Sequence, residues 1–284
     1  MSRLTLFFAV GLGRRFVQKG TMPWLSSALD PRRVAELVPS FPCLPEVVMF
    51  SALCGQSPAL HGRVLSRDTG NSPLEAPSVA EFAPQLRMRI DARLLEAACA
   101  EGLDSASRSR KARELDEELR TLFESRQEGE VLLLAGVAGA RAARERIAWE
   151  ELARSVEAEV EVESAVLRFR SAQATRRAEM REALLRLQGV ERVLRDEALA
   201  ALHLPTENGE LLLALAREGF SFAEERASVG SYECPPGEEG VFVGLGCRAR
   251  TSWPSKLHAL RLAPSVAAHL GRATAGYADR PFAL

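Results

Sequence analysis

"RKARELDEELRTLFESRQEGEVLLLAGVAG", residues 110–139, decides the fold class. In its first part, apolar side chains recur at the spacing of one helix face: Leu115, Leu119, Leu122 and Phe123. This spacing predicts an amphipathic helix. Gly129 ends the helix, and the apolar run from Val131 predicts a strand that is buried on both faces. A helix, a short break and a buried strand are typical of a parallel α/β sheet.

Other segments extend the same α/β pattern. Continuous apolar runs predict strands at 4–10 and in "GVFVGLG", residues 240–246, whereas "GELLLALA", residues 209–216, is either a strand or an apolar helix. Helices are predicted at four places: 47–53 with Gly55 as its C-cap, 141–158, 173–201 with an interruption at Gly189, and 260–271 with Pro264 in the first turn.

Composition and charge exclude several classes of protein. The chain has 284 residues, 46% of them hydrophobic and 26% charged, which is ordinary for a globular protein. A net charge of -1 gives no reason to expect nucleic acid or an anionic membrane as a partner. Five scattered cysteines without C-x-x-C spacing indicate neither a zinc knuckle nor a disulfide framework. We therefore expect a cytoplasmic protein.

The N-terminal apolar run is too short to span a bilayer, and it does not have the pattern of a signal peptide. It covers only seven residues, Leu4 to Val10, and Arg14 and Arg15 follow where a cleavage site needs small residues. We interpret it as the first buried strand of the sheet, with an export signal as the minor alternative.

Taken together and in order, these segments resemble the type I phosphodiesterase/nucleotide pyrophosphatase family of the alkaline phosphatase superfamily. The resemblance rests on residues 110–139, on the C-terminal segments 240–246 and 260–271, and on three further stretches. These are "LFFAVGLGRRFVQKGTMPWLSSAL" (6–29), "SFPCLPEVVMFSALCGQSPALHG" (40–62) and "LLRLQGVERVLRDEALAALHLPTENGELLLALAREGFSF" (184–222). It implies one α/β domain over residues 1–284, with a largely parallel central sheet, helices on both faces and a small subdomain around 160–225.

The resemblance also implies where catalytic residues should lie. Enzymes of this family use two divalent metals to activate a threonine or serine and to hold a phosphoryl group at a helix N-terminus. The nucleophile position corresponds to Pro45 in this chain. The metal-ligand positions, occupied in the family by aspartate and histidine, correspond to Gly13, Leu95, Cys99, Gly136, Val137 and Glu239. A shifted alignment would place Asp91 at the aspartate position, but Leu95 then stands where the partner histidine is needed.

The residues themselves agree with a lost metal site. Glycine, leucine and valine carry no donor atom, and the chain has only four histidines, none in a metal-ligand spacing: His61, His203, His258 and His269. Pro45 removes a backbone N–H from the helix terminus. Glu46 adds a negative charge that would repel phosphate by about 1 to 4 kcal/mol at near contact. The sequence thus predicts an anion site that has lost its function.

Three residues could still contribute to chemistry or binding. Cys43 is the nearest replacement nucleophile, but no basic residue adjoins it in sequence, so a buried or loop thiol is favoured. Arg14 and Arg15 follow the first strand and are candidates for anion binding, although a structural role is the alternative. His61 belongs to a turn that is part of the scaffold in the family.

We therefore expect a catalytically inactive homologue, or pseudoenzyme, that acts as a binding or scaffold protein and needs no cofactor. Its partner would be a protein, either an active relative or a second copy of itself, and neither nucleic acid nor a membrane. One alternative is a divergent phosphodiesterase/nucleotide pyrophosphatase with two divalent metals such as zinc. A third possibility is a small-molecule or nucleotide binder that uses the old cleft without metal.

Overall fold

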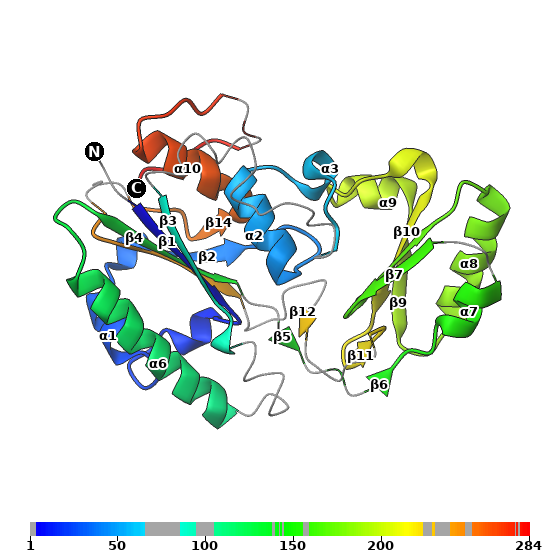
Figure 1. Ribbon diagram of the computed structural model, residues 1–284, viewed down its shortest axis with the longest axis horizontal. Helices are drawn as coiled ribbons and strands as arrows, with labels where there is room; N and C mark the ends of the chain where they lie inside the picture. Colours follow the sequence, from blue (N-terminus) through cyan, green and yellow to red (C-terminus); the bar gives the residue numbers. More distant parts are fainter. Residues whose placement is uncertain are drawn as a thin grey trace.

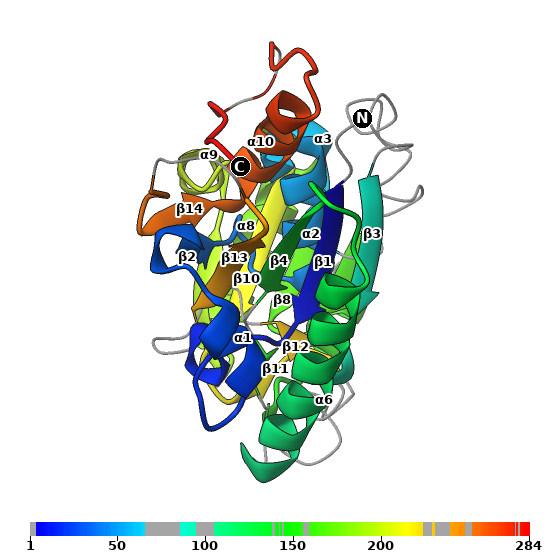
Figure 2. The same cartoon turned by 90° about the vertical axis from the view of Figure 1, so that its left-hand side faces the viewer.

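A six-stranded sheet forms the centre of the larger part of the molecule. The computed structural model describes residues 4–65, 86–94, 105–137, 140–141, 143, 145–155, 159–223, 229–230, 239–247, 252–275, 277 and 279–284. The strands of this sheet are β1 (Leu4–Val10), β2 (Val34–Val38), β3 (Leu86–Asp91), β4 (Val131–Val137), β13 (Gly240–Leu245) and β14 (Lys256–His258). They lie side by side in the order β14-β2-β13-β4-β1-β3 (Figure 2).

The sheet is largely parallel, as predicted. β1 pairs in parallel with both β3 and β4, and β14 pairs in parallel with β2. β13 pairs antiparallel with β4 and β2, so it is the one strand of this sheet that runs against the others. The predicted strands at 4–10 and 240–246 are confirmed as β1 and β13, and the strand after Gly129 is confirmed as β4.

Helices cover both faces of the sheet, which also confirms the prediction. α1 (Pro23–Ala28) and α6 (Ser105–Glu124) lie on one face, and α2 (Pro45–Cys54) and α10 (Leu262–His269) lie on the other (Figure 1). In β4, Leu132 and Leu134 pack in the cluster that contains α6, whereas Leu133 packs in the cluster that contains α2. This two-sided burial explains why β4 is apolar at every position.

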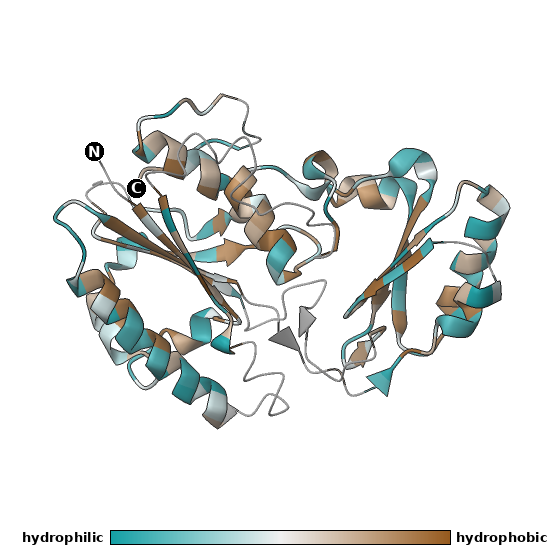
Figure 3. Ribbon diagram, viewed as in Figure 1, coloured by the Kyte–Doolittle hydropathy of each residue, from teal (hydrophilic) through white to brown (hydrophobic). Residues whose placement is uncertain are grey.

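The two helical layers differ in how far they are buried. α2 is apolar around its whole circumference, and α6 carries hydrophilic residues on the side away from the sheet (Figure 3). In α2 every residue except Glu46 is buried. A helix that is apolar all round must be covered on all sides, so α2 needs a second partner besides the central sheet.

Leu262 and Val266 of α10 pack with Leu53 of α2 and supply part of that cover. A second, four-stranded sheet with the order β7-β8-β10-β9 lies against the start of α2. Its strands are β7 (Glu159–Glu163), β8 (Val166–Arg170), β9 (Val190–Leu194) and β10 (Leu211–Ala216), and all neighbours are antiparallel. α8 (Ala174–Arg186) and α9 (Asp196–Ala201) accompany it (Figure 1). Leu44 and Val47 at the start of α2 share an apolar cluster with Leu213 of β10. The predicted subdomain around 160–225 falls on this region, and its independence as a folding unit stays a prediction.

Short elements connect the two sheets. Two-residue strands pair β5 (Ala140–Arg141) with β12 (Val229–Gly230), and β6 (Glu145–Arg146) with β11 (Phe220–Ser221). The remaining helices are α3 (Pro58–His61), α7 (Glu150–Ser155) and the 3-10 turns η1 (Arg14–Phe16), η2 (Pro31–Arg33), η6 (Glu207–Gly209) and η7 (Ala259–Arg261). Among the helices that the structure describes, none is both long enough and apolar enough to cross a lipid bilayer.

Two helix predictions are wrong in part. The predicted helix 141–158 is reduced to α7, because β6 pairs with β11 and Ile147 is buried against the second sheet. The predicted helix 173–201 contains strand β9 between α8 and α9. Gly189 has φ +93°, and a Cβ there would lie 2.7 Å from Cγ of Phe220, so the backbone turns at this glycine into β9. The helices at α2 and α10 and the C-cap at Gly55 are confirmed. Residues 209–216, predicted as either a strand or an apolar helix, contain the strand β10.

Candidate functional site

The carboxyl ends of β1 and β4 bring most of the predicted ligand positions to one edge of the central sheet. After β1, the backbone N–H of Gly11 donates to the carbonyl of Val137 (2.7 Å), and Arg14 N–H donates to the carbonyl of Glu239 (2.8 Å). Gly13 forms a β-bridge with Gly240. In open α/β sheets, ligands bind at the carboxyl ends of the strands, so this edge is the candidate site.

Backbone atoms fill the space at this edge. A Cβ atom on Gly136 would come within 3.0 Å of the Leu12 carbonyl oxygen and lie 2.8 Å from Cγ1 of Val241. A Cβ on Gly240 would lie 2.6 Å from the Gly136 carbonyl oxygen. Leu12 itself is completely buried. The two glycines allow this close approach of the chains, and a side chain long enough to reach a metal from Gly136 does not fit without movement of the backbone.

The N-terminus of α2, where the resemblance places the nucleophile, is also occupied by apolar packing. Leu44 is the N-cap residue and has no side-chain hydrogen bond to the helix, and Pro45 at the first position has no N–H to offer an anion. Both side chains are buried. Glu46 is exposed, and its carboxylate lies in the first turn, where the partial positive charge of the helix end favours it. This helix end therefore has one N–H group fewer to donate to an anion, and the negative charge of Glu46 repels the anion.

Cys43 lies next to this edge but is not accessible. It is 2% exposed and packs in the same apolar cluster as Val10, Val48 and Val137. A nucleophile must reach its substrate, so the thiol needs a rearrangement of the core before it can react. Of the other described cysteines, Cys54 is buried and Cys247 is half-buried, and desolvation raises the pKa of each thiol to about 11.

A serine and a histidine lie in hydrogen-bond contact, a pair that the sequence analysis missed. Ser51 Oγ lies 2.9 Å from Nε2 of His61. The backbone N–H of Arg63 donates to Nδ1 of His61 (3.1 Å), so the neutral ring carries its proton on Nε2. Nε2 then donates to Ser51 instead of accepting its proton, and Ser51 is completely buried. The pair joins the last residue of α3 to α2. To act as a general base toward Ser51, His61 would need the opposite tautomer.

Three arginines surround the turn after β1. Arg14 and Arg15 are exposed in η1, and the Arg15 guanidinium lies 4.9 Å from the ring centre of Phe16. Arg108 of α6 is 2% exposed, lies 4.8 Å from the same ring, and its Nη2 donates to the Gly11 carbonyl (3.3 Å). Sequence analysis missed Arg108, because it stands between Ser107 and Ser109 in a polar stretch of the sequence.

Asp91 reaches the same edge, but its carboxylate is engaged. In the register of the sheet, Asp91 pairs with Ala9, which pairs with Gly136. The Asp91 carboxylate forms an ion pair with Nη2 of Arg93 (2.6 Å) and accepts a hydrogen bond from Arg93 N–H (2.9 Å). Leu95 and Cys99, the other positions of this predicted ligand pair, lie outside the described residues.

The residues present at the described positions do not fit a pair of divalent cations. Gly13, Gly136 and Val137 have no donor side chain. Within the described part of the chain, no group of three or more His, Cys, Asp or Glu side chains could hold a metal ion. His258 and His269 belong to β14 and α10, and burial lowers the pKa of both imidazoles.

Three solved structures that share this fold are ectonucleotide pyrophosphatases / phosphodiesterases by name. Human ectonucleotide pyrophosphatase / phosphodiesterase 5 (ENPP5, NPP5) is 12% identical, with a TM-score of 0.72 and coverage of 96% of each chain. The murine protein is 11% identical with a TM-score of 0.72, covering 98% of this chain and 97% of the other. An inactive threonine-to-alanine variant of the murine protein, in complex with AMP, is 10% identical with a TM-score of 0.73 and the same coverage.

These similarities confirm the predicted resemblance at the level of the fold. No protein-family model matches the chain. No curated protein matches its sequence either.

Proposed function

We propose that this chain is a non-catalytic member of the nucleotide pyrophosphatase/phosphodiesterase family that works as a binding or scaffold protein. The observation that carries the proposal is the packing of Leu12 and Val241 against Gly136, where the family places a metal-binding aspartate. A metal ligand cannot be restored there by a change of rotamer, because the space for its Cβ is already taken. The likeness of fold over almost the whole chain supports the family assignment.

Several independent changes favour loss of catalysis over altered catalysis. The nucleophile position holds a proline, which has no hydroxyl. The ligand positions at Gly13, Gly136 and Val137 hold residues without donors. The nearest thiol, that of Cys43, is 2% exposed. An enzyme that had merely exchanged one ligand for another would keep a cluster of donors at the strand ends.

A hydrolysis assay tests the loss of catalysis. Purified protein is incubated with bis(p-nitrophenyl) phosphate and supplied with zinc or manganese, with and without EDTA. We expect the same rate of p-nitrophenol release as in buffer with metal alone. The alternative, a divergent metal-dependent phosphodiesterase, predicts turnover that EDTA abolishes, and such a result would overturn the proposal.

Binding of an anionic ligand, such as a nucleotide, without metal is a second candidate for the same edge. Arg14 and Arg15 are exposed beside it, and guanidinium groups recognise phosphate. The inactive murine variant described above was solved in complex with AMP, so loss of activity in that protein does not prevent nucleotide binding. A thermal shift with AMP that EDTA leaves unchanged, and that the double substitution of Arg14 and Arg15 by Met removes, is the expected result. No shift at millimolar AMP would exclude this candidate.

The proposed partner is an active relative or a second copy of this chain, in a reducing cytoplasmic setting. Cys43, Cys54 and Cys247 are free thiols, which supports such a setting. Light scattering coupled to size-exclusion chromatography tests the self-association. A mass of one chain, 31.0 kDa, at every concentration would leave only the pairing with another protein.

A further inference from the structure

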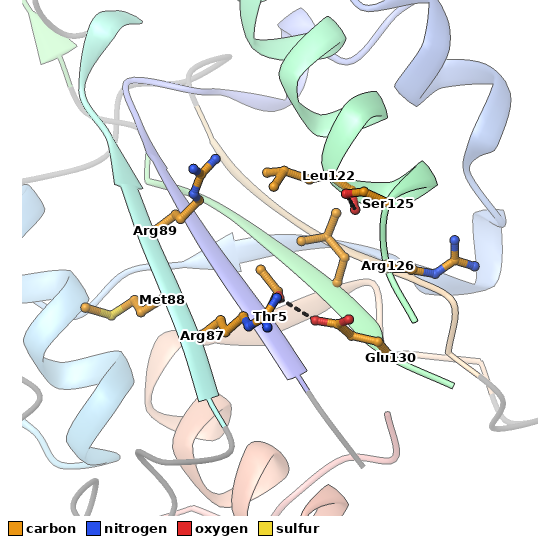
Figure 4. Close-up of a pocket in the computed structure, with 9 residues that line it drawn as sticks. Thr5, Arg87, Met88, Arg89, Leu122, Ser125, Arg126 and Glu130 are labelled. Carbon is orange, nitrogen blue, oxygen red and sulfur yellow. Dashed lines mark hydrogen bonds between the residues drawn. The ribbon is translucent and has the colours of Figure 1, made fainter. Parts of the chain in front are cut away.

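A cavity lies at the opposite, amino-terminal edge of the central sheet, away from the candidate site. It has a volume of about 400 Å³ and is lined by Thr5, Arg87, Met88, Arg89, Leu122, Ser125, Arg126, Glu130 and Leu132 (Figure 4). Leu132, Thr5 and Arg87 form one row across β4, β1 and β3, because Thr5 pairs with both neighbours. Pockets for small organic molecules span roughly 300–1,000 Å³, so this cavity suits a small ligand.

The cavity exists because α6 stops short of the edge of the sheet. α6 ends at Glu124, and the chain then runs through Ser125 and Arg126 back to β4, which leaves the first residues of the strands uncovered on this face. Leu122 and Leu132 provide an apolar surface at this place. Thr5 is the one polar residue of β1, and it faces the cavity.

A buried carboxylate forms one wall. Glu130 is 6% exposed, and its Oε1 accepts a hydrogen bond from Thr5 Oγ1 (2.9 Å). Its Oε2 accepts one from the backbone N–H of Gln127 (3.2 Å). Each oxygen therefore keeps a free lone pair that can accept a further donor from a ligand.

Three arginines line the cavity beside this carboxylate, and they differ in how many contacts they make with other residues. Arg126 is held by the Phe123 carbonyl (Nη1 to O, 2.7 Å) and stacks on the Phe123 ring. Arg89 pairs with Glu118 (2.8 Å). Arg87 takes part in none of the ion pairs among the described residues, although it lines the cavity. A guanidinium with free donors beside an apolar surface is a binding group for a carboxylate or a phosphate.

We propose that this cavity binds a small organic anion, with its carboxylate or phosphate on Arg87 and its apolar body against Leu122 and Leu132. Arg89 adds a second positive charge, and Glu130 accepts a hydroxyl or amino group of the ligand. The site is separate from the edge that holds Gly13 and Gly136, so it does not depend on the function proposed for that edge.

Calorimetric titration of the full chain tests the proposal with four probes. Benzoate and phenyl phosphate carry an apolar body with either anionic group, inorganic phosphate lacks the body, and benzyl alcohol lacks the charge. We expect saturable binding of benzoate or phenyl phosphate, with a Kd at least about tenfold lower than that of inorganic phosphate or benzyl alcohol. The better of the two organic probes identifies the anionic group.

Two variants and one matched control complete the design. Arg87→Met removes the anchor at an exposed position, and Ser125→Trp fills the cavity from an exposed position of the chain. Both should raise the Kd at least about tenfold while the far-UV circular dichroism stays unchanged. Arg192→Met removes the same charge from an exposed position on β9 and should leave the Kd unchanged. Absence of saturable binding, or equal binding by Arg87→Met and the wild type, would overturn the proposal.

Discussion

Replacing Gly136 by alanine should destabilise the protein, because the candidate site has no room for a single additional carbon. The new Cβ would come within 3.0 Å of the Leu12 carbonyl oxygen and lie 2.8 Å from Cγ1 of Val241, and backbone must move to relieve the first contact. Overpacking of this kind costs about 1 to 3 kcal/mol of the free energy of unfolding. Gly136→Asp adds an unpaired carboxylate in a buried strand, at a further cost of about 3 to 5 kcal/mol.

Urea denaturation followed by far-UV circular dichroism measures both effects as shifts of the midpoint at constant slope. Gly20→Ala is the matched control, since a Cβ on Gly20 meets nothing within 4 Å. We expect Gly20→Ala within about 0.5 kcal/mol of the wild type. Gly136→Ala should be clearly less stable, and Gly136→Asp should lie near the limit of folding, because a domain has only about 5 to 15 kcal/mol in total. The reasoning is refuted if Gly136→Ala matches Gly20→Ala, or if Gly136→Asp folds and binds zinc.

Three further predictions concern residues around the two sheets. Ser51→Ala removes the partner of His61 Nε2 and should lower the free energy of unfolding, measured by urea denaturation, by about 1 kcal/mol. A variant as stable as the wild type would contradict the structural role of the pair. Asp116 is 1% exposed and accepts hydrogen bonds from the backbone N–H groups of Trp24 and Leu25. Burial raises the pKa of its carboxyl above the ordinary value of 3.8. The contribution of Asp116 to stability therefore falls as the pH rises from 3.8 through the raised pKa. An NMR titration measures the pKa of the Asp116 carboxyl, and a value at or below 3.8 would contradict this prediction. Cys54 and Cys247 each have a pKa of about 11, so about one thiol in a thousand is a thiolate at pH 8. Ellman's reagent should therefore modify both cysteines slowly in the native chain and fast in urea. Equal rates of modification in the native chain and in urea would contradict the raised pKa values.

The sequence predicted those parts of the fold in which one segment carries its own signal. β1, β4 and β10 are apolar at almost every position, and α6 has a leucine on its buried face at each turn. A continuous or periodic run of apolar residues indicates which positions of a segment are buried, and it can be recognised within that segment alone. The order of such segments was enough to indicate the fold.

Other parts depend on contacts that a single segment does not reveal. β9 has the sequence VERVL between two helices, and only its pairing with β10 makes it a strand. β3 alternates apolar and charged residues over six positions, and β2 has only five residues with Glu36 at its centre. Arg108 stands between two serines in a polar stretch of sequence, and its burial comes with the packing of Phe16 from η1 against it.

The candidate site, too, could be predicted in part only. The family resemblance identified Gly13, Gly136, Val137 and Glu239 as ligand positions, and the structure brings these four positions to one edge of the sheet. It did not reveal that Leu12 and Val241 close the space above Gly136, because that depends on the distance between three backbones. The engagement of Asp91 by Arg93 likewise depends on a turn after β3.

Metal content measures the central claim most directly. The full chain, incubated with a fivefold excess of zinc or manganese and then freed of unbound metal by gel filtration, is analysed by inductively coupled plasma mass spectrometry. The account predicts substoichiometric metal, well below one ion per chain. Two tightly bound ions per chain would contradict it, since the strand ends would then still hold the pair of cations that a phosphodiesterase of this fold requires.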